Sequence, residues 1–250
     1  MSRTARWWVL LLGLVGVAVL LALAFVSMPP FGTSQHPYRD AAVAAAVAHA
    51  TANVVAAVNF DQRALDTLGE ETILFGSVVA VAALLRPSDE ERVRRPSGGR
   101  GPMEGTRVVG YLMLPLTLVV GIDVVLHGQS TPGGGFQGGV VLATGLHLLY
   151  VAGQYRSLEQ LRPLPLFEYT EAAGTAAFAV IGLVTLATSG TVLANALPYG
   201  TFGQLLSAGT VPLLNVAVGI AVGSGAVVLL AQFLQQLVLV TRDDDRVEAA

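Results

Sequence analysis

The chain has 250 residues, of which 53% are hydrophobic and 12% are charged, with a net charge of −3 at pH 7. Soluble domains are about one-quarter charged, so this composition indicates a membrane protein, and the negative charge argues against a nucleic-acid partner. The sequence contains no cysteine, which excludes disulfides, thiolate metal sites and a cysteine nucleophile.

The first apolar segment, residues 7–26, is uncharged and as long as the roughly 20 residues that a membrane-spanning helix requires. We interpret it as an anchor rather than a signal peptide, because no small-residue cleavage site follows it. Five further spans are predicted, at residues 68–85, 108–126, 138–152, 170–186 and 211–240. The fold class is therefore an all-α integral membrane protein with about six transmembrane helices.

Residues 40–60 lie between the first two spans and are rich in alanine. Valines 43, 47, 54 and 58 fall on one helical stripe, which is typical of a helix lying flat at the membrane surface. His49 and Asn53 share a face of this segment, and we interpret them as packing residues.

The arginines indicate which side each loop occupies. With six spans and a cytoplasmic N-terminus, only Arg39 and Arg63 lie outside, and the other 12 arginines lie inside. If residues 40–60 also crossed, only Arg3, Arg6 and Arg63 would lie inside. The positive-inside rule therefore favours six spans plus one outer interfacial helix, with both termini in the cytoplasm.

The same pattern divides the chain into parts. Residues 1–86 form a two-span segment, and residues 87–106 form a polar cytoplasmic linker rich in glycine and proline. Residues 107–241 form a four-span domain, and residues 242–250 form a cytoplasmic tail.

Charged side chains inside a bilayer are costly, so each is a candidate functional group. To span the membrane, the second span must extend back through Glu70 and Glu71, with Asp66 near the interface. Consecutive helical residues point about 100° apart, so one acid is expected to face protein and the other lipid headgroups. The alternative is that both acids are solvated and stabilise the start of the helix.

Other titratable residues carry weaker signals. Asp123 and His127 are four residues apart on one helix face, where they form either a proton-passing pair or a structural hydrogen bond. His147 lies in mid-span, where a hydrogen bond between helices is favoured over a proton relay. Glu168 and Glu171 flank the start of the fifth span, where acids stabilise a helix N-terminus.

The stretch LHGQSTPGGGFQGGVV, residues 126–141, joins the third and fourth spans. Irregular backbone near a membrane must be buried by protein, so we expect a compact outer turn that serves docking rather than catalysis. The last span carries a G-x-x-x-G pair that lets helices approach closely. The turn residues are Pro132, Gly133, Gly134, Gly135, Gly138 and Gly139, and the packing pair is Gly219 and Gly223.

No motif of an enzyme site is present. The sequence lacks metal-ligand spacing of the H-E-x-x-H kind and a G-x-S-x-G elbow, and the triple glycine is not followed by Lys-Ser/Thr. We therefore expect no metal, no cofactor and no enzyme activity.

The glycine stretch resembles the B-type subunit of the Mrp-type multisubunit sodium/proton antiporters, and a closely similar protein occurs in membrane-bound hydrogenases. The stretches SAGTVPLLNVAVGIAVGSG and FEYTEAAGTAAFAVIGL are also similar to that subunit, so the resemblance covers about residues 107–240. Gln129 stands where relatives often have histidine, which weakens any site assignment at Gln129.

Residues 50–86 resemble a different segment of the same complexes. It is found at the C-terminal end of the large antiporter subunit, or as a separate small hydrogenase membrane subunit. The family's D-T-L-G-E corresponds to residues 66–70, so its acid falls on Glu70 and Glu71 is an additional acid. Ala64 and Leu65 replace the family's usual Gly-Phe.

The resemblance implies an accessory membrane subunit of a multisubunit cation (sodium)/proton antiporter, contributing to the ion path at its subunit interfaces and to assembly. The chain contains no lysine and lacks the long antiporter core, so it is not the main pumping subunit. Its implied partners are other membrane subunits, lipids, sodium and protons. The alternatives are a membrane subunit of a hydrogenase-like or complex I-related redox pump, and a purely structural scaffold. The transported cation and its stoichiometry stay open.

Overall fold

The computed structural model describes residues 3–28, 32, 34, 36–85, 104–152 and 163–234, and all regular structure within them is helical. This confirms the predicted all-α class. The chain divides into two compact units, Met1–Asp40 and Ala41–Ala250. Six long helices correspond to the six predicted spans: α1 (Arg3–Val26), α4 (Ala64–Leu84), α6 (Glu104–Leu126), α7 (Gly135–Val151), α9 (Leu164–Ser189) and α10 (Val211–Leu234).

Five of these helices are long and apolar enough to cross a membrane, namely α1, α4, α6, α9 and α10. The sixth, α7, has 17 residues, at the short end of the roughly 17–25 residues that span a bilayer. In the first unit, α1 is apolar around its whole circumference, with Trp7 and Trp8 near its start. A helix that is apolar on all sides is suited to lipid or to a helix of another protein in a complex.

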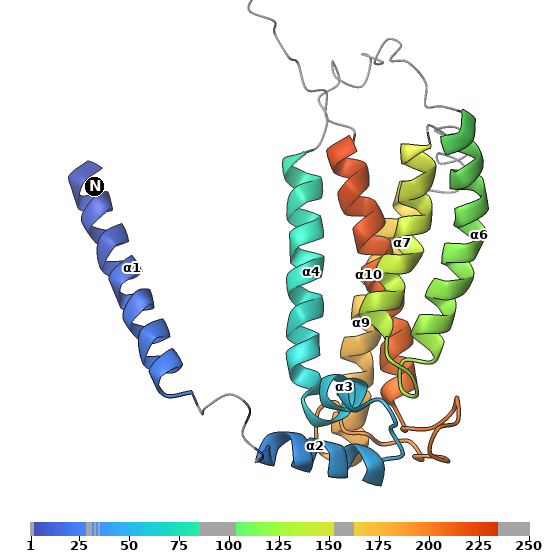
Figure 1. Cartoon of the computed structure of the whole chain (residues 1–250), viewed down its shortest axis with the longest axis horizontal. Coiled ribbons are helices and arrows are strands. Elements are labelled where there is room, and N and C mark those ends of the chain that lie inside the picture. The colour runs from blue at the N-terminus through green and yellow to red at the C-terminus, as the bar shows by residue number, and fades with distance from the viewer. Residues whose placement is uncertain are drawn as a thin grey trace, which may run out of the picture. The chain divides into compact units, whose positions relative to one another are not determined.

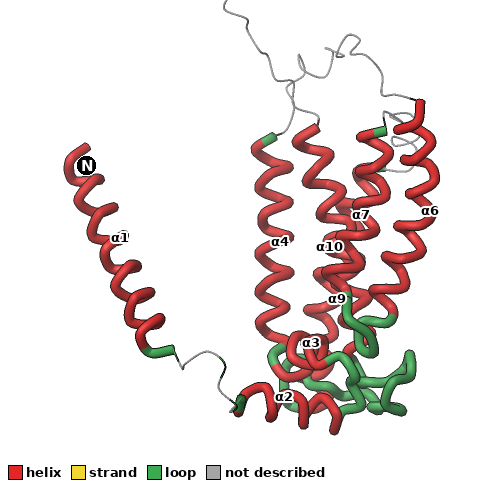
Figure 2. Tube along the Cα trace, viewed as in Figure 1, coloured by secondary structure: helices red, strands yellow, loops and turns green. Residues whose placement is uncertain are grey.

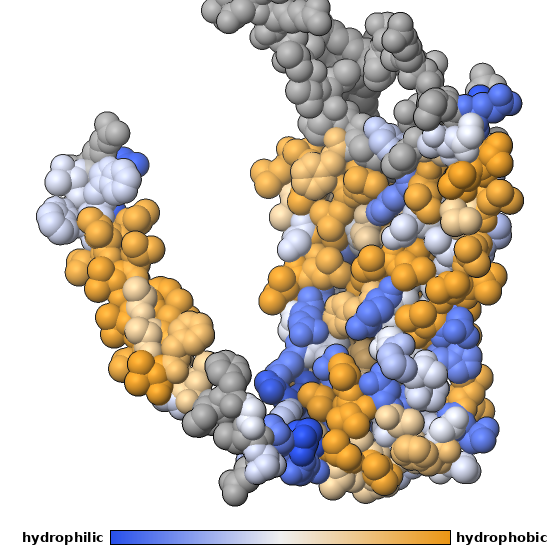
Figure 3. All heavy atoms as spheres, in the orientation of Figure 1, coloured by the Kyte–Doolittle hydropathy of each residue, from blue (hydrophilic) through white to orange (hydrophobic). Residues whose placement is uncertain are grey.

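In the second unit, α4, α6, α7, α9 and α10 run side by side, and α10 contacts each of the other four (Figures 1 and 2). Of the most apolar stretch of α10, 67% is buried, compared with 17% for α4 and for α6. The core of this unit therefore surrounds α10. Figure 3 shows apolar side chains over much of the visible face, with polar residues gathered toward the end where α2 lies.

Glycines allow α7 and α10 to pack backbone against backbone. A Cβ built on Gly139 would lie 2.8 Å from the backbone N of Gly223 and 2.9 Å from the carbonyl oxygen of Gly219. A Cβ on Gly135 would lie 2.4 Å from the carbonyl oxygen of Asn215. The G-x-x-x-G pair of α10 thus faces glycines that belong to the predicted turn stretch.

The sequence predicted one continuous helix over residues 40–60, but the outer segment is broken into three pieces. It consists of α2 (Pro37–Ala48), α3 (Val54–Ala57) and a π-helical turn, η1 (Val58–Gln62). The chain breaks at Ala50, whose φ is +53°, and Asn53 then caps α3 by accepting hydrogen bonds from the next backbone N–H groups.

In Figure 1, α2 lies across the end of the bundle at which α4 begins. Ala42 and Ala46 are buried, whereas Val43 and Val47 point outward. The orientation of α2 agrees with the prediction that this segment does not cross the membrane.

Two predicted parts fall largely outside the described residues, namely most of the linker 87–106 and the whole tail 242–250. The described part of the last span ends at residue 234. Helix α4 begins at Ala64, four residues before the predicted span, so it contains Asp66, Glu70 and Glu71.

Candidate functional site

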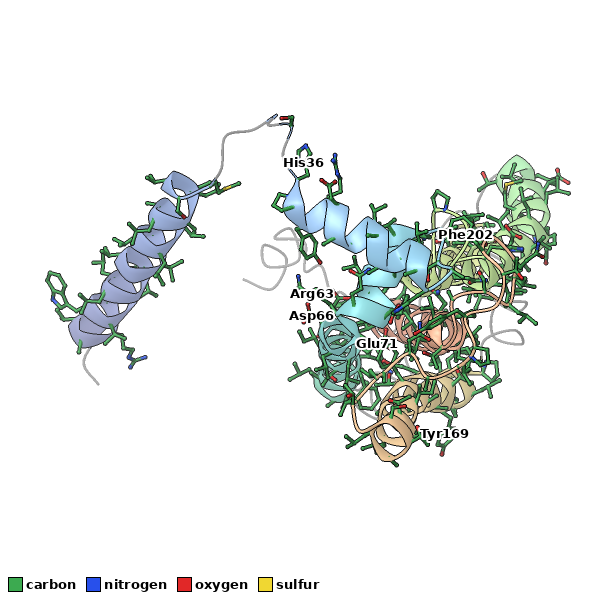
Figure 4. All side chains as sticks on the ribbon, turned by 90° about the horizontal axis from the view of Figure 1, so that it is seen from below. His36, Arg63, Asp66, Glu71, Tyr169 and Phe202 are labelled. Carbon is green, nitrogen blue, oxygen red and sulfur yellow. The ribbon has the colours of Figure 1, made fainter. Side chains whose placement is uncertain are left out.

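The consecutive acids of α4 point in different directions. Glu71 is 1% exposed, whereas Glu70 is exposed on the outer side of the helix. Figure 4 shows Glu71 among the helices, and Arg63 and Asp66, which form an ion pair, toward the edge. The sequence predicted that one of the two acids faces protein and the other faces lipid headgroups, and within this chain the protein-facing acid is Glu71.

A second buried acid lies on α9. Glu171 is 2% exposed, and Glu168, one turn earlier, is exposed. A Cβ built on Gly225 of α10 would lie 2.9 Å from Glu171 Oε1 and 3.3 Å from Val78 Cγ2. Because Val78 belongs to α4, the carboxylate of Glu171 lies where α4, α9 and α10 meet. Its burial corrects the interpretation of Glu171 as an acid that only stabilises a helix N-terminus.

The two buried acids are poorly compensated. Both oxygens of Glu71 and Oε1 of Glu171 lack a hydrogen-bond partner among the residues that the structure describes. Glu70, the residue next to Glu71, is also acidic. The sequences of α4, α9 and α10 contain no arginine, lysine or histidine that offers a positive charge.

Hydroxyl groups that are buried or half-buried lie close to each acid along the chain. Thr67, one turn before Glu71, is buried and donates a hydrogen bond to the carbonyl oxygen of Asn59 at 2.7 Å. Thr170, next to Glu171, is 2.8 Å from Ser224 of α10, Oγ1 to Oγ. Each acid therefore has a polar neighbour within an otherwise apolar bundle.

The predicted pair on α6 forms. His127 Nδ1 lies 2.9 Å from Asp123 Oδ1, with both side chains substantially exposed. The pair lies at the end of α6 that carries the glycine turn, and its role in proton transfer stays a prediction. His147 is half-buried in α7, and its role also stays a prediction.

The glycine turn is held by two asparagines from distant segments. Asn53 Nδ2 donates hydrogen bonds to the carbonyl oxygens of Gly128 at 2.7 Å and Thr131 at 2.9 Å. Asn215 Oδ1 of α10 accepts a hydrogen bond from the N–H of Gly135 at 2.9 Å. Asn53 therefore does more than the packing that the sequence suggested, because it binds the turn to the outer segment.

The backbone of the turn explains why glycine is present. Gly133 and Gly134 have φ values of +140° and +139°, which other residues rarely adopt. Pro132 is exposed, and Gln129 is fully buried and donates to the carbonyl oxygen of Leu205 at 2.6 Å.

Sequence reasoning missed one cluster at the outer end. His49 Nδ1 lies 2.5 Å from Asp61 Oδ2, and the His49 ring stacks on Tyr199 at a centroid distance of 4.4 Å. The three residues come from the turn after α2, from η1 and from the loop before α10. Their wide separation along the chain leaves no local pattern by which the sequence could reveal them.

Among the described residues, no group of three or more His, Cys, Asp or Glu side chains is arranged to hold a metal ion. A cavity of about 360 Å³ lies between α6, α7, α9 and α10, lined mainly by leucine, valine and other apolar side chains. An apolar cavity is suited to hydrocarbon and not to an ion. The buried acids are therefore the chemically distinctive feature of the bundle.

Comparison with known proteins places these features in a wider context. Residues 106–228 match the family described as a domain related to the MnhB subunit of Na+/H+ antiporter. An uncharacterized protein of Methanocaldococcus jannaschii is 31% identical over 201 residues, which cover 69% of this chain and 73% of that protein. A probable A/B-type component of a K(+)/H(+) antiporter of Rhizobium meliloti is 32% identical over 136 residues, covering 46% of this chain and 14% of that protein.

Two solved structures share the fold. A chain of the membrane-bound sulfane sulfur reductase, an archaeal respiratory membrane complex, has a TM-score of 0.72 and 26% identity, with 93% of this chain and 100% of that chain covered. A chain of the Mrp complex from Dietzia sp. DQ12-45-1b has a TM-score of 0.66 and 23% identity, with 93% of this chain and 26% of that chain covered. The second likeness is one of fold.

Proposed function

This chain belongs to the family of proteins related to the MnhB subunit of Na+/H+ antiporters, and on that premise we propose that it is an accessory subunit of a multisubunit cation/proton antiporter. The resemblance to the B-type antiporter component is confirmed, and the matches to multisubunit membrane complexes indicate membrane subunits as partners. In this proposal the chain supports assembly and contributes titratable groups to an ion path that carries sodium and protons.

The observation that carries the proposal is the position of Glu70. It projects from the exposed side of α4 in the second turn of a helix that is long enough to span a membrane. A carboxylate facing hydrocarbon is costly, so this side chain requires water, lipid headgroups or a polar surface on a neighbouring protein of the complex. Glu70 then lines a path between subunits, and Asp66 and the Asp123–His127 pair belong to the same outer end.

Replacing Glu70 with glutamine is expected to lower cation/proton antiport several-fold while the complex still assembles. Glutamine keeps the shape of the side chain and removes the group that carries a proton. Sodium- and potassium-driven pH changes in inverted vesicles measure the effect. Glu168→Gln is the matched control, because it neutralises another exposed acid, and it is expected to transport at the parental rate. Parental transport by Glu70→Gln would favour a purely structural role.

The topology in this proposal places both termini and the 86–107 linker in the cytoplasm, with residues 29–66 and 128–137 outside. The chain has no native cysteine, so single cysteines report sidedness directly. We expect a membrane-impermeant thiol reagent to label a cysteine at the exposed Thr201 in intact cells, and a cysteine at Ser97 only after cell disruption. Labelling of position 97 from outside would contradict this map.

A second candidate function follows from the likeness to the sulfane sulfur reductase complex, which covers the whole of that chain. In that case the protein belongs to a redox-coupled ion pump. Purification of the intact complex through a tag on this chain distinguishes the two. Antiporter subunits alone support the first proposal, whereas co-purifying iron–sulfur subunits support the second.

A further inference from the structure

We infer that Glu71 and Glu171 are two successive proton-binding stations inside this chain, in the interface between α4, α9 and α10. The inference rests on the proposed function for its role in transport, but the stations are a property of the chain itself. They differ from Glu70, which faces away from the bundle. They give the chain an internal path in addition to any path along its contacts with other subunits.

The two acids enter the bundle from opposite ends. Helices α4 and α9 run antiparallel, as Figures 1 and 2 show. Glu71 and Glu171 are each the eighth residue of their helix, so each lies about 10 Å from its own end at 1.5 Å per residue. The two acids therefore lie at different depths in the bundle, one nearer each end.

The spacing between the stations follows from Val78. Gly225 approaches both Glu171 Oε1 and Val78 Cγ2, so Glu171 lies at the level of Val78. Val78 is two turns beyond Glu71 on the same face of α4, or about 10 Å along the axis. A gap of this length is suited to a relay through water more than to a direct carboxylate pair.

The electrostatics favour protons on both groups. An ionised carboxylate buried without a partner is unfavourable, and a second negative charge nearby adds repulsion. The acidic neighbours along the same helices are Glu70 on α4 and Glu168 on α9, and the described part of α10 contains no charged residue. The neutral, protonated form of each acid is therefore the favoured one. To pass a proton on, each acid must release it and then bind another.

A structural role does not account for the two acids. Neither Glu71 oxygen accepts a hydrogen bond in the described residues, so Glu71 does not tie helices together. A Cβ on Gly225 would lie 2.9 Å from Glu171 Oε1, so the absence of a side chain at Gly225 gives this carboxylate its place. The chain thus buries two acids and leaves three of their carboxylate oxygens without a hydrogen-bond partner among the described residues.

Carbodiimide labelling of the complete complex in its membrane tests the inference. Dicyclohexylcarbodiimide reacts with protonated carboxyl groups in apolar surroundings, and mass spectrometry of peptides locates the product. We expect Glu71 and Glu171 to be labelled several-fold more than their exposed neighbours Glu70 and Glu168. Labelling is expected to fall as the pH rises, because the reagent requires the proton.

Two further variants complete the test. In Glu71→Gln, Glu171 is expected to stay reactive, and in Glu171→Gln, Glu71 is expected to stay reactive, which excludes unfolding as the cause of labelling. Equal labelling of all four acids, or labelling of Glu70 and Glu168 alone, would overturn the inference. Selective labelling in a complex that shows no antiport would leave the stations intact and reject the proposed function instead.

Discussion

Replacing Gly139 with alanine is expected to destabilise the bundle by about 1–3 kcal/mol, the usual effect of overpacking a tightly packed interface. The added Cβ would lie within 3 Å of the backbone N of Gly223 and the carbonyl oxygen of Gly219. Backbone atoms cannot rotate away as a side chain does, so α7 and α10 must separate. We expect a lower thermal midpoint of the purified complex and less intact complex after detergent extraction.

Two matched substitutions separate this contact from a general effect of alanine. A Cβ at Gly76 of α4 meets nothing within 4 Å, so Gly76→Ala is expected to leave the thermal midpoint unchanged or slightly higher. At Gly223 the nearest atom is 3.3 Å away, so Gly223→Ala should have an intermediate effect, whereas Gly223→Leu should weaken packing strongly. A Gly139→Ala complex as stable as the parent would contradict the backbone contact between α7 and α10.

The long helices were predictable because membrane spans leave a strong signal. About 20 apolar residues without charge are rare in other contexts. The arginine asymmetry predicts that residues 40–60 do not cross the membrane. The break in that segment was not predictable. It depends on the positive φ of Ala50 and on Asn53, which binds the turn at Gly128 some 75 residues away.

The sequence also could not show which of the two acids, Glu70 or Glu71, is buried. Interior and lipid-facing surfaces of a membrane helix are both apolar, so the pattern around α4 does not show how the helix is rotated. Family resemblance pointed to Glu70, whereas packing against α10 turns Glu71 inward. Glu171 was interpreted as a residue that stabilises a helix start. Its burial could not be predicted, because its neighbour Gly225 is 54 residues further along the chain.

Replacing Glu71 with glutamine is expected to reduce proton-coupled transport by about tenfold or more, since a group that transfers a proton typically contributes 10²–10⁴-fold. The same change removes a carboxyl group whose ionised form is unfavourable in the bundle, and it keeps the shape of the side chain. The thermal midpoint is therefore expected to stay equal or to rise. Loss of activity without loss of stability separates a proton-carrying role from a structural one.

Glu171→Gln is expected to behave in the same way, and the double variant is expected to be no worse than either single variant. Stations in series produce this result, because blocking one step already stops the flow. Proton flux in inverted vesicles and calorimetry of the purified complex measure the two properties on the same preparation. Glu168→Gln supplies the control, since it removes an exposed acid from the same helix. Transport at the parental rate in Glu171→Gln, or additive losses in the double variant, would place the proton path outside the α4–α9–α10 interface.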